Sequence, residues 1–245
     1  MRTVKIFCPA HITGLFTVEE RSNPLFKGSR GVGVTLSNGV HTEVKVEPSS
    51  TWKIRVRSLG ARIRGEVSRR VVELLKGRMP QPFHIEIVHR FDVPVGSGYG
   101  ASGAGALGVA IGLNEALGLG LSWSEAAAFA HLAETQCGTG LGSVLAEYHG
   151  GLGFRVRAGA PGIGLVKKIN SEGLWVASAC WGPIPTKKLL LNCEALNRIR
   201  RVGEKLLRVF QARPSAETFL NLSKTFSSRL GLETLRVRSC LLYTS

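Results

Sequence analysis

The chain has 245 residues, of which 44% are hydrophobic and 20% are charged. This length and composition suit one large or two small folded domains, and they exclude a disordered, collagen-like or disulfide-stapled protein. The charge is strongly basic, since 32 Lys and Arg residues against 17 Asp and Glu residues give a net charge of +15. Such a surplus favours an anionic partner: nucleic acid, a membrane surface, or a phosphorylated or carboxylate ligand.

Strand patterns dominate the first part of the chain. Residues 4–8 alternate weakly and end at Pro9, which predicts a first strand. Residues 31–36 and 40–46 read as two strands, and the Asn38-Gly39 pair between them is typical of a hairpin turn. Three further elements follow: a strand at 52–57 with a basic outer face, an amphipathic helix at 63–75 and a strand at 83–88.

Helices and glycine-rich breaks fill the middle of the chain. A glycine-rich loop at 94–100 precedes a helix of small residues, and Ser122 with Glu125 forms a capping box for a helix that ends near residue 136. The glycines of the small-residue helix, with Asn114 and Glu115, predict a buried, tightly packed helix and not a membrane span. The elements expected after it are a short helix at 144–148, strands at 154–157, 165–169 and 174–180, and two amphipathic helices, the second stopped by Gly231.

The cysteines and the N-terminus indicate a compartment. There are five cysteines, an odd number without C-x-x-C spacing, so we expect neither a metal cluster nor a disulfide framework. No apolar signal-peptide core is visible at the N-terminus. We therefore expect a cytoplasmic protein that does not span a membrane.

The loop from Pro94 to Gly100 is the most informative segment. Glycines let backbone N–H groups approach a ligand, and the following helix start adds free N–H groups, so the segment suits phosphate. A Walker A loop is rejected because no Lys follows the glycines, and a dinucleotide fingerprint at Gly98, Gly100 and Gly103 lacks its βαβ context. Close helix packing accounts for Gly105, Gly108 and Gly112 but not for the glycines ahead of the helix.

Five segments, in order, resemble the GHMP kinases, and within them the archaeal kinases that phosphorylate pantoate. Residues 9–16 (PAHITGLF) resemble the opening signature, and Pro94, Gly98, Gly100 and Ser102 match the glycine loop in register. The other three segments are 130–142, 150–162 and 182–186.

The resemblance implies an α+β fold of two halves. Residues 1–160 would form the ATP-binding domain, similar to ribosomal protein S5 domain 2, and residues 161–245 a ferredoxin-like domain. The flexible stretch 158–162 lies at that boundary. No further glycine motif follows Gly231, so the second domain is expected to be incomplete. The implied activity is transfer of the γ-phosphate of ATP, with Mg²⁺, to the 4-hydroxyl of pantoate for coenzyme A synthesis. A mevalonate-type or homoserine-type acceptor is the alternative within the superfamily.

Site residues follow from the resemblance position by position. Ser102 and Glu134 would be the catalytic and Mg²⁺-binding residues, although Ser102 also suits an ordinary helix N-cap. Substrate would be held by His131, Arg155 and Thr186, although the strand pattern around Arg155 equally suits a solvent-facing residue like Arg157. His11 and Thr13 are expected to line the same pocket. The residues implied to contact ATP are Pro94, Gly96, Ser97, Gly98, Gly100, Ala101, Ser102 and Gly103.

Position 143 departs from the family pattern. GHMP kinases that use a catalytic aspartate place it at the end of a TGLGD segment, where this chain has Ser143. A serine cannot act as a carboxylate base, so the substitution predicts base-independent chemistry, a shifted substrate or lost activity. Phosphoryl transfer tolerates a weak base because it depends mainly on positioning and charge neutralisation.

The basic residues gather on two predicted segments, 55–70 and 198–208. Proteins that bind single-stranded nucleic acid usually interleave such residues with stacking aromatics, and these segments do not. A solvated basic surface is the favoured interpretation, and a basic S5-like RNA-binding protein without kinase activity is the alternative of a different class. The expected partner is a small hydroxy acid, with no membrane and no nucleic acid, and a homodimer is left open.

Overall fold

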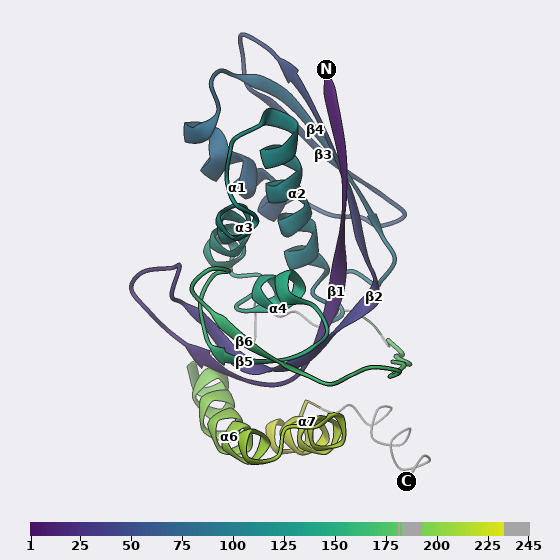
Figure 1. The fold of residues 1–245 in the computed structure, drawn as a ribbon, viewed down its shortest axis with the longest axis vertical. Helices are drawn as coiled ribbons and strands as arrows, with labels where there is room; N and C mark the ends of the chain where they lie inside the picture. Colours follow the sequence, from purple (N-terminus) through teal and green to yellow (C-terminus); the bar gives the residue numbers. More distant parts are fainter. Residues whose placement is uncertain (181, 183–192, 233–245) are drawn as a thin grey trace.

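The structure, a computed structural model, describes residues 1–180, 182 and 193–232. Two long antiparallel strands form its frame: β1 (Arg2–Glu19) and β2 (Gly28–Pro48). They run from the upper end of the molecule down to the two helices near its lower end, and curve there (Figure 1). The mixed helices and strands and the arrangement described below confirm the predicted α+β class.

A six-stranded sheet is built on these two strands. Residues 40–48 of β2 pair with β4 (Phe83–Phe91), which also pairs in parallel with β3 (Lys53–Leu59). Residues 31–34 of β2 pair instead with β5 (Leu152–Arg157), which pairs with β6 (Leu165–Ile169). The strand order is therefore β3-β4-β2-β5-β6, with β1 paired to β2.

Two predictions for the first half of the sheet were wrong. The first strand does not end at Pro9, because β1 continues past it through a register shift. Proline is tolerated there because β1 pairs only with β2, so no second strand requires the N–H that proline lacks. Asn38-Gly39 forms no hairpin. It lies inside β2, between the residues that pair with β5 and those that pair with β4. A Cβ at Gly39 would collide with the carbonyl oxygen of Cys8, so glycine is needed there for close approach.

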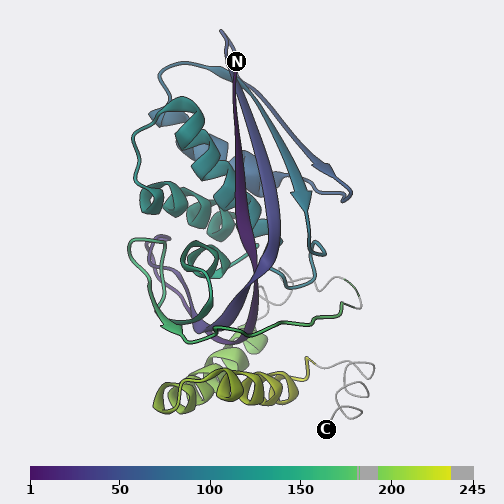
Figure 2. The same cartoon turned by 45° about the vertical axis from the view of Figure 1, so that its right-hand side comes forward.

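Three helices cover one face of the upper sheet (Figure 2). They are α1 (Glu66–Leu75, followed by the 3-10 turn η1, Lys76–Arg78), α2 (Ala101–Leu117) and α3 (Trp123–Cys137). As predicted, α2 is buried on nearly all sides, and the capping box of Ser122 and Glu125 begins α3. Gly108 and Gly112 let α2 approach Thr42 and Val44 of β2, which confirms their packing role.

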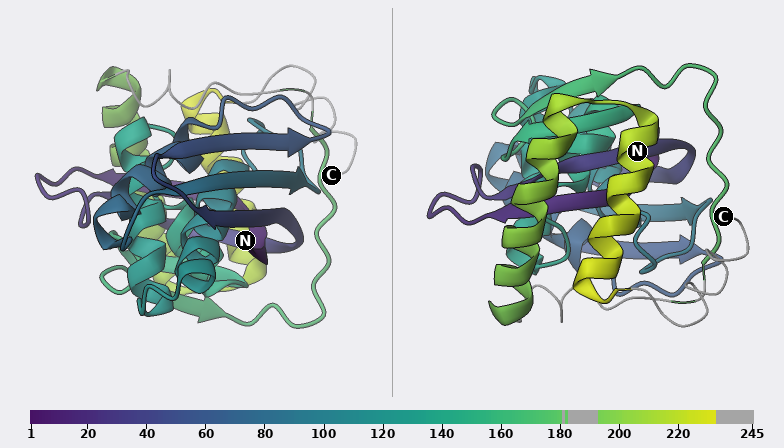
Figure 3. Two further views of the ribbon diagram at one scale, coloured as in Figure 1. Left: turned by 90° about the horizontal axis from the view of Figure 1, so that it is seen from above. Right: turned by 90° about the horizontal axis from the view of Figure 1, so that it is seen from below.

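A second core forms around the lower end of the sheet. The short helix α4 (Ser143–His149) packs against β1 and α2. Below the sheet, α6 (Cys193–Ala212) and α7 (Ala216–Leu230) lie side by side across β1 (Figure 3). Their apolar faces meet β1, β2 and β5 in one cluster that includes Leu15, Val32, Phe154, Phe210 and Phe226. Gly231 ends α7 in the left-handed conformation, as predicted.

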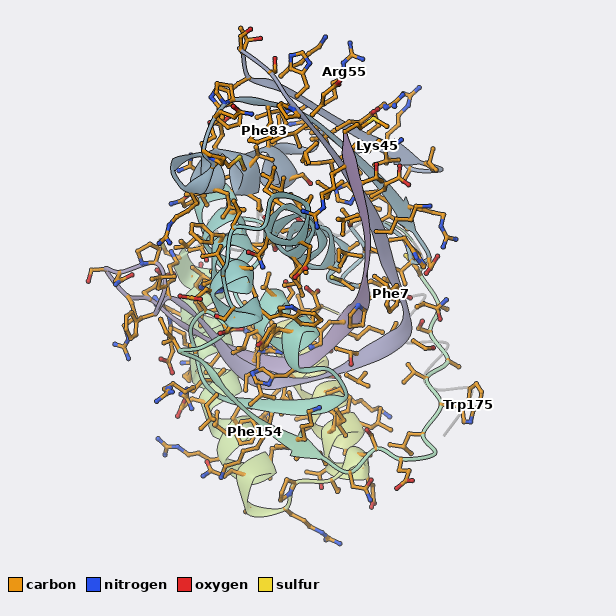
Figure 4. The ribbon with its side chains drawn as sticks, turned by 45° about the horizontal axis from the view of Figure 1, so that its top comes forward. Phe7, Lys45, Arg55, Phe83, Phe154 and Trp175 are labelled. Atoms are coloured by element: carbon orange, nitrogen blue, oxygen red, sulfur yellow. The ribbon has the colours of Figure 1, made fainter. Side chains whose placement is uncertain are left out.

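Residues 174–180 differ from the prediction. They were expected to form a strand, but they form no ladder with any described segment, and all of them are exposed. Their apolar pattern has no neighbouring strand to pair with, and Trp175 is 97% exposed and lies away from the body of the molecule (Figure 4). No helix in the described residues has the length and apolarity needed to cross a bilayer. The domain boundary at residue 160 stays a prediction.

Candidate active site

The glycine loop lies where the sequence places it, between β4 and α2. Gly96, Gly98 and Gly100 all have positive φ angles, of 78°, 86° and 65°, which side-chain-bearing residues rarely adopt. Pro94, Gly96 and Gly98 are exposed, and the loop is tied to β1 through the His11 N–H, which donates to the Tyr99 carbonyl at 2.9 Å. The loop thus offers accessible backbone groups at the start of a 17-residue helix.

Ser102 and Glu134, predicted as partners from separate helices, meet directly. The Ser102 hydroxyl donates to Glu134 Oε1 at 2.5 Å, and the hydroxyl of Thr139 donates to the same oxygen at 2.7 Å. Ser102 is exposed, whereas Glu134 is 2% exposed. Burial raises the pKa of Glu134 above its usual value, and the two hydroxyl donors oppose that rise.

Arg155 is buried, at 1% exposure, so the solvent-facing interpretation of this residue was wrong. Its Nη1 lies 3.2 Å from Nε2 of His11, and its Nε has no hydrogen-bond partner among the described residues. Burial, with the charge of Arg155, holds the pKa of His11 well below its usual value, so this imidazole is neutral and accepts from Arg155. Burial also lowers the pKa of Arg155 to about 10, which leaves it charged at neutral pH.

Of the two other predicted substrate residues, only His131 lies within the described part of the chain, and its hydrogen bond leads elsewhere. His131 is buried on α3, and its Nε2 lies 3.1 Å from the carbonyl oxygen of Pro24 in the β1–β2 connection. Burial lowers its pKa below the usual value. This contact suits a residue that holds the connection in place. Thr186 lies outside the described residues. Thr13 contacts Nδ1 of His11 at 3.4 Å.

One acidic residue of the site was missed by sequence reasoning. Glu147 on α4 is 3% exposed, and neither of its carboxylate oxygens has a hydrogen-bond partner among the residues that the structure describes. Its Oε2 lies 2.7 Å from the position that a Cβ would take on Gly103. A signal existed in the sequence: Glu147 is a lone carboxylate after the apolar run 144–146, the same pattern that singled out Glu134.

These groups form a polar centre beneath the start of α2. Burial raises the pKa of Glu147 well above its usual value, the negative charge of Glu134 raises it further, and the positive charge of Arg155 opposes the rise. Ser102 and Glu134, which meet at one side of this centre, provide oxygen atoms that suit a divalent cation. No three His, Cys, Asp or Glu side chains cluster closely enough to hold a metal by themselves in the described part of the chain. Mg²⁺ here would need phosphate oxygens as further ligands, and in kinase sites Mg²⁺ is usually bound by one or two carboxylates together with substrate phosphates.

Comparisons with known proteins identify the fold and the family. A family model described as the GHMP kinases N-terminal domain matches residues 66–151, which span α1 to α4. A solved structure described as a phosphotransferase related to the CoA biosynthesis pathway superposes with a TM-score of 0.80 at 29% identity, covering 95% of this chain and 77% of that one. Mevalonate diphosphate decarboxylase from Staphylococcus aureus, at a TM-score of 0.63 and 14% identity, shares the fold. The fold and the family-model match define a GHMP kinase.

Two curated relatives narrow this further. Pantoate kinase from Methanocaldococcus jannaschii is 33% identical over 231 residues, which are 93% of this chain and 80% of that protein. Pantoate kinase from Thermococcus kodakarensis is 32% identical over 232 residues, which are 94% of this chain and 76% of that protein. The chain belongs to the pantoate kinase family.

Proposed function

We propose that the protein transfers the γ-phosphoryl group of ATP to the 4-hydroxyl of pantoate, forming 4-phosphopantoate for coenzyme A synthesis. The observation that carries the proposal is the placement of two unlike groups at one centre. The glycine loop and the exposed Ser102 begin α2 where the Glu147 carboxylate approaches Gly100 and Gly103. The charge of the buried Arg155 guanidinium acts on the same carboxylate. The first suits the phosphates of a nucleotide, and the second suits the carboxylate of a hydroxy acid.

The residues divide the work as follows. The backbone of Gly96, Gly98 and Gly100 cradles the phosphates, with the first turn of α2 adding its free N–H groups. Ser102 and Glu134 supply oxygen ligands for Mg²⁺, which when bound would neutralise charge on the transferred group. Arg155, oriented by the neutral His11, holds the substrate carboxylate and so sets which hydroxyl faces the nucleotide.

The alternatives gain less support. The arginines of β3 and α1 and those of α6 lie at opposite ends of the molecule (Figure 1), so they do not form one basic surface for RNA. Lys45 and Arg55 point outward at the upper end of the sheet (Figure 4), and neighbouring Arg57 is already paired with Glu86. A cytoplasmic location and a homodimer stay predictions from the sequence.

A coupled assay of ADP release tests the proposal. The protein is supplied with ATP, Mg²⁺ and, in separate reactions, pantoate, mevalonate or homoserine. We expect turnover with pantoate above that with the other two acceptors. No ADP above background with pantoate would refute the proposed substrate, and turnover confined to another acceptor would reassign it within the superfamily.

A further inference from the structure

Glu147 is a buried carboxylate without a hydrogen-bond partner in the described part of the chain. Burying a carboxylate without a partner is costly, and a glutamine of the same shape would avoid the cost. Its neighbours on α4, Val144, Leu145 and Ala146, are apolar and buried. The charge of Arg155 offsets part of the cost, but no hydrogen bond from Arg155 reaches either carboxylate oxygen. The position of this group therefore calls for a chemical explanation.

The carboxylate lies beneath the start of α2. Its Oε1 approaches the place where a Cβ would stand on Gly100, and its Oε2 lies 2.7 Å from the corresponding place on Gly103. Both glycines belong to the segment proposed to hold phosphate. The carboxylate also interacts electrostatically with Arg155, which is proposed to hold the acceptor. Glu147 is therefore coupled to the residues of both ends of the site, the phosphate end and the acceptor end.

Glu147 also stands beside Ser143. The two residues are one helical turn apart on α4, so they share one face of the helix. The place of a Cβ on Gly103 lies 2.5 Å from Ser143 Oγ and 2.7 Å from Glu147 Oε2, so both side chains converge on one point. This is the point where an acidic side chain at position 143 would be expected. A carboxylate reaches it here from the next turn of the helix.

We propose that Glu147 accepts the proton of the substrate hydroxyl during phosphoryl transfer, and so acts as the carboxylate base that Ser143 cannot be. The inference rests on the proposed function. As the hydroxyl oxygen forms its bond to the γ-phosphorus, the bond from that phosphorus to the β,γ-bridging oxygen breaks, and its electron pair leaves on ADP. The hydroxyl proton passes to the Glu147 carboxylate, which later releases it to water.

The surroundings of Glu147 support proton uptake. The titratable and charged groups that face it are Glu134 from α3, Arg155 from β5 and Cys8 from β1. Burial and the charge of Glu134 raise the pKa of Glu147, and Arg155 opposes them without cancelling the rise. A base accepts a proton best when its pKa approaches the working pH, and an ordinary glutamate lies well below it.

The test compares three proteins: the wild type, Glu147→Gln, and Ser143→Asp combined with Glu147→Gln. We expect Glu147→Gln to lower kcat for pantoate by about 10²- to 10⁴-fold, which is the usual contribution of a general base. The KM for pantoate and the KM for ATP should change little. The double variant should have a kcat at least about tenfold higher than that of Glu147→Gln, because an aspartate at position 143 would bring a carboxylate to the same point. The acidic limb of the kcat–pH profile should vanish in Glu147→Gln and return in the double variant.

Thermal unfolding and the Kd of a non-hydrolysable ATP analogue control for folding. Glu147→Gln should unfold close to the wild type, because it exchanges a buried carboxylate without a hydrogen-bond partner for an amide of the same shape. The double variant should bind the ATP analogue with the Kd of the wild type. If Glu147→Gln does not fold, the comparison uses Glu147→Asp, which keeps the charge but withdraws it by one methylene and should lose about tenfold or more in kcat.

Two results would overturn the inference alone. One is a wild-type enzyme active on pantoate whose Glu147→Gln variant keeps kcat within about threefold, far below the usual contribution of a general base. The other is a loss in Glu147→Gln that Ser143→Asp does not restore, since that pattern would mark a structural role. A wild type without turnover on any acceptor would instead refute the proposed function, and the inference with it.

Discussion

Gly103 is the position where one added methyl group should separate packing from catalysis. A Cβ there would stand 2.5 Å from Ser143 Oγ and 2.7 Å from Glu147 Oε2, whereas ordinary contacts begin near 3.4 Å. Gly105, two residues along the same buried helix, is the matched control, because its Cβ would meet nothing nearer than a His89 ring carbon at 3.4 Å. Gly103→Ala and Gly105→Ala thus make the same chemical change in different surroundings.

The expected magnitudes follow from those distances. Alanine is favoured over glycine inside a helix by up to about 1 kcal/mol, which both variants gain. Gly103→Ala must also push two polar side chains back by roughly 1 Å, and overpacking of this kind costs about 1–3 kcal/mol. Gly103→Ala should therefore lose up to about 2 kcal/mol of stability, while Gly105→Ala should be neutral or slightly stabilised. A displacement of about 1 Å in an active site costs roughly 10²-fold in turnover.

Urea unfolding followed by circular dichroism measures the first quantity, and coupled ADP release with pantoate measures the second. For a chain of this size, 1 kcal/mol corresponds to about 2–4 °C in Tm, so a thermal scan provides a second reading. Turnover of Gly103→Ala within about threefold of wild type would refute the reasoning, because the space beside Ser143 and Glu147 would then not matter. An equal loss of turnover in Gly105→Ala would refute it as well, since the effect would belong to the helix as a whole.

Three further changes test other parts of the molecule. Ser122→Ala removes the cap of α3 and should cost about 1 kcal/mol in urea unfolding with no loss of kcat; an unchanged midpoint would argue against the cap. Arg155→Lys loses the planar fork and should raise KM for pantoate by about 10-fold or more, with KM for ATP unchanged. The pKa of Glu147 is raised in the folded protein, so Glu147 contributes to the free energy of unfolding at pH below about 4.5. This contribution is lost as the pH rises through the pKa that Glu147 has in the folded protein. The advantage of Glu147→Gln in unfolding free energy should therefore grow as the pH rises above about 4.5, and a difference that stays constant with pH would contradict the assigned shift.

The helices and the glycine loop could be read from the chain because their signals are local. The capping box at Ser122 and Glu125, the left-handed glycines of the loop and the stop at Gly231 each depend on residues within one turn of the feature. The spacing of apolar residues in α6 and α7 likewise predicted which face of each helix is buried. In these segments the conformation follows from backbone preference and periodicity alone.

The errors share a cause, which is that the conformation of these segments depends on whether another part of the chain lies beside them. Asn38-Gly39 favours a turn in isolation, but β2 there changes its partner from β5 to β4, and the ladders on either side hold it extended. Residues 174–180 alternate like a strand, yet no described strand lies beside them to complete a ladder. Strand propensity reflects how well side chains pack against neighbouring strands, and those strands come from other parts of the chain.

The ordered motifs established the superfamily and the pairing of Ser102 with Glu134, because they state residue types at set spacings. The environment of each group was decided only by the tertiary structure. A strand pattern could not tell whether Arg155 faces solvent or a buried carboxylate, and nothing local placed Glu147 against Gly103 and Gly100. Burial and charge coupling arise where β1, α2, α3, α4 and β5 converge, and these segments lie far apart along the chain. The chemistry of the centre therefore depends on contacts that no single stretch of the sequence contains.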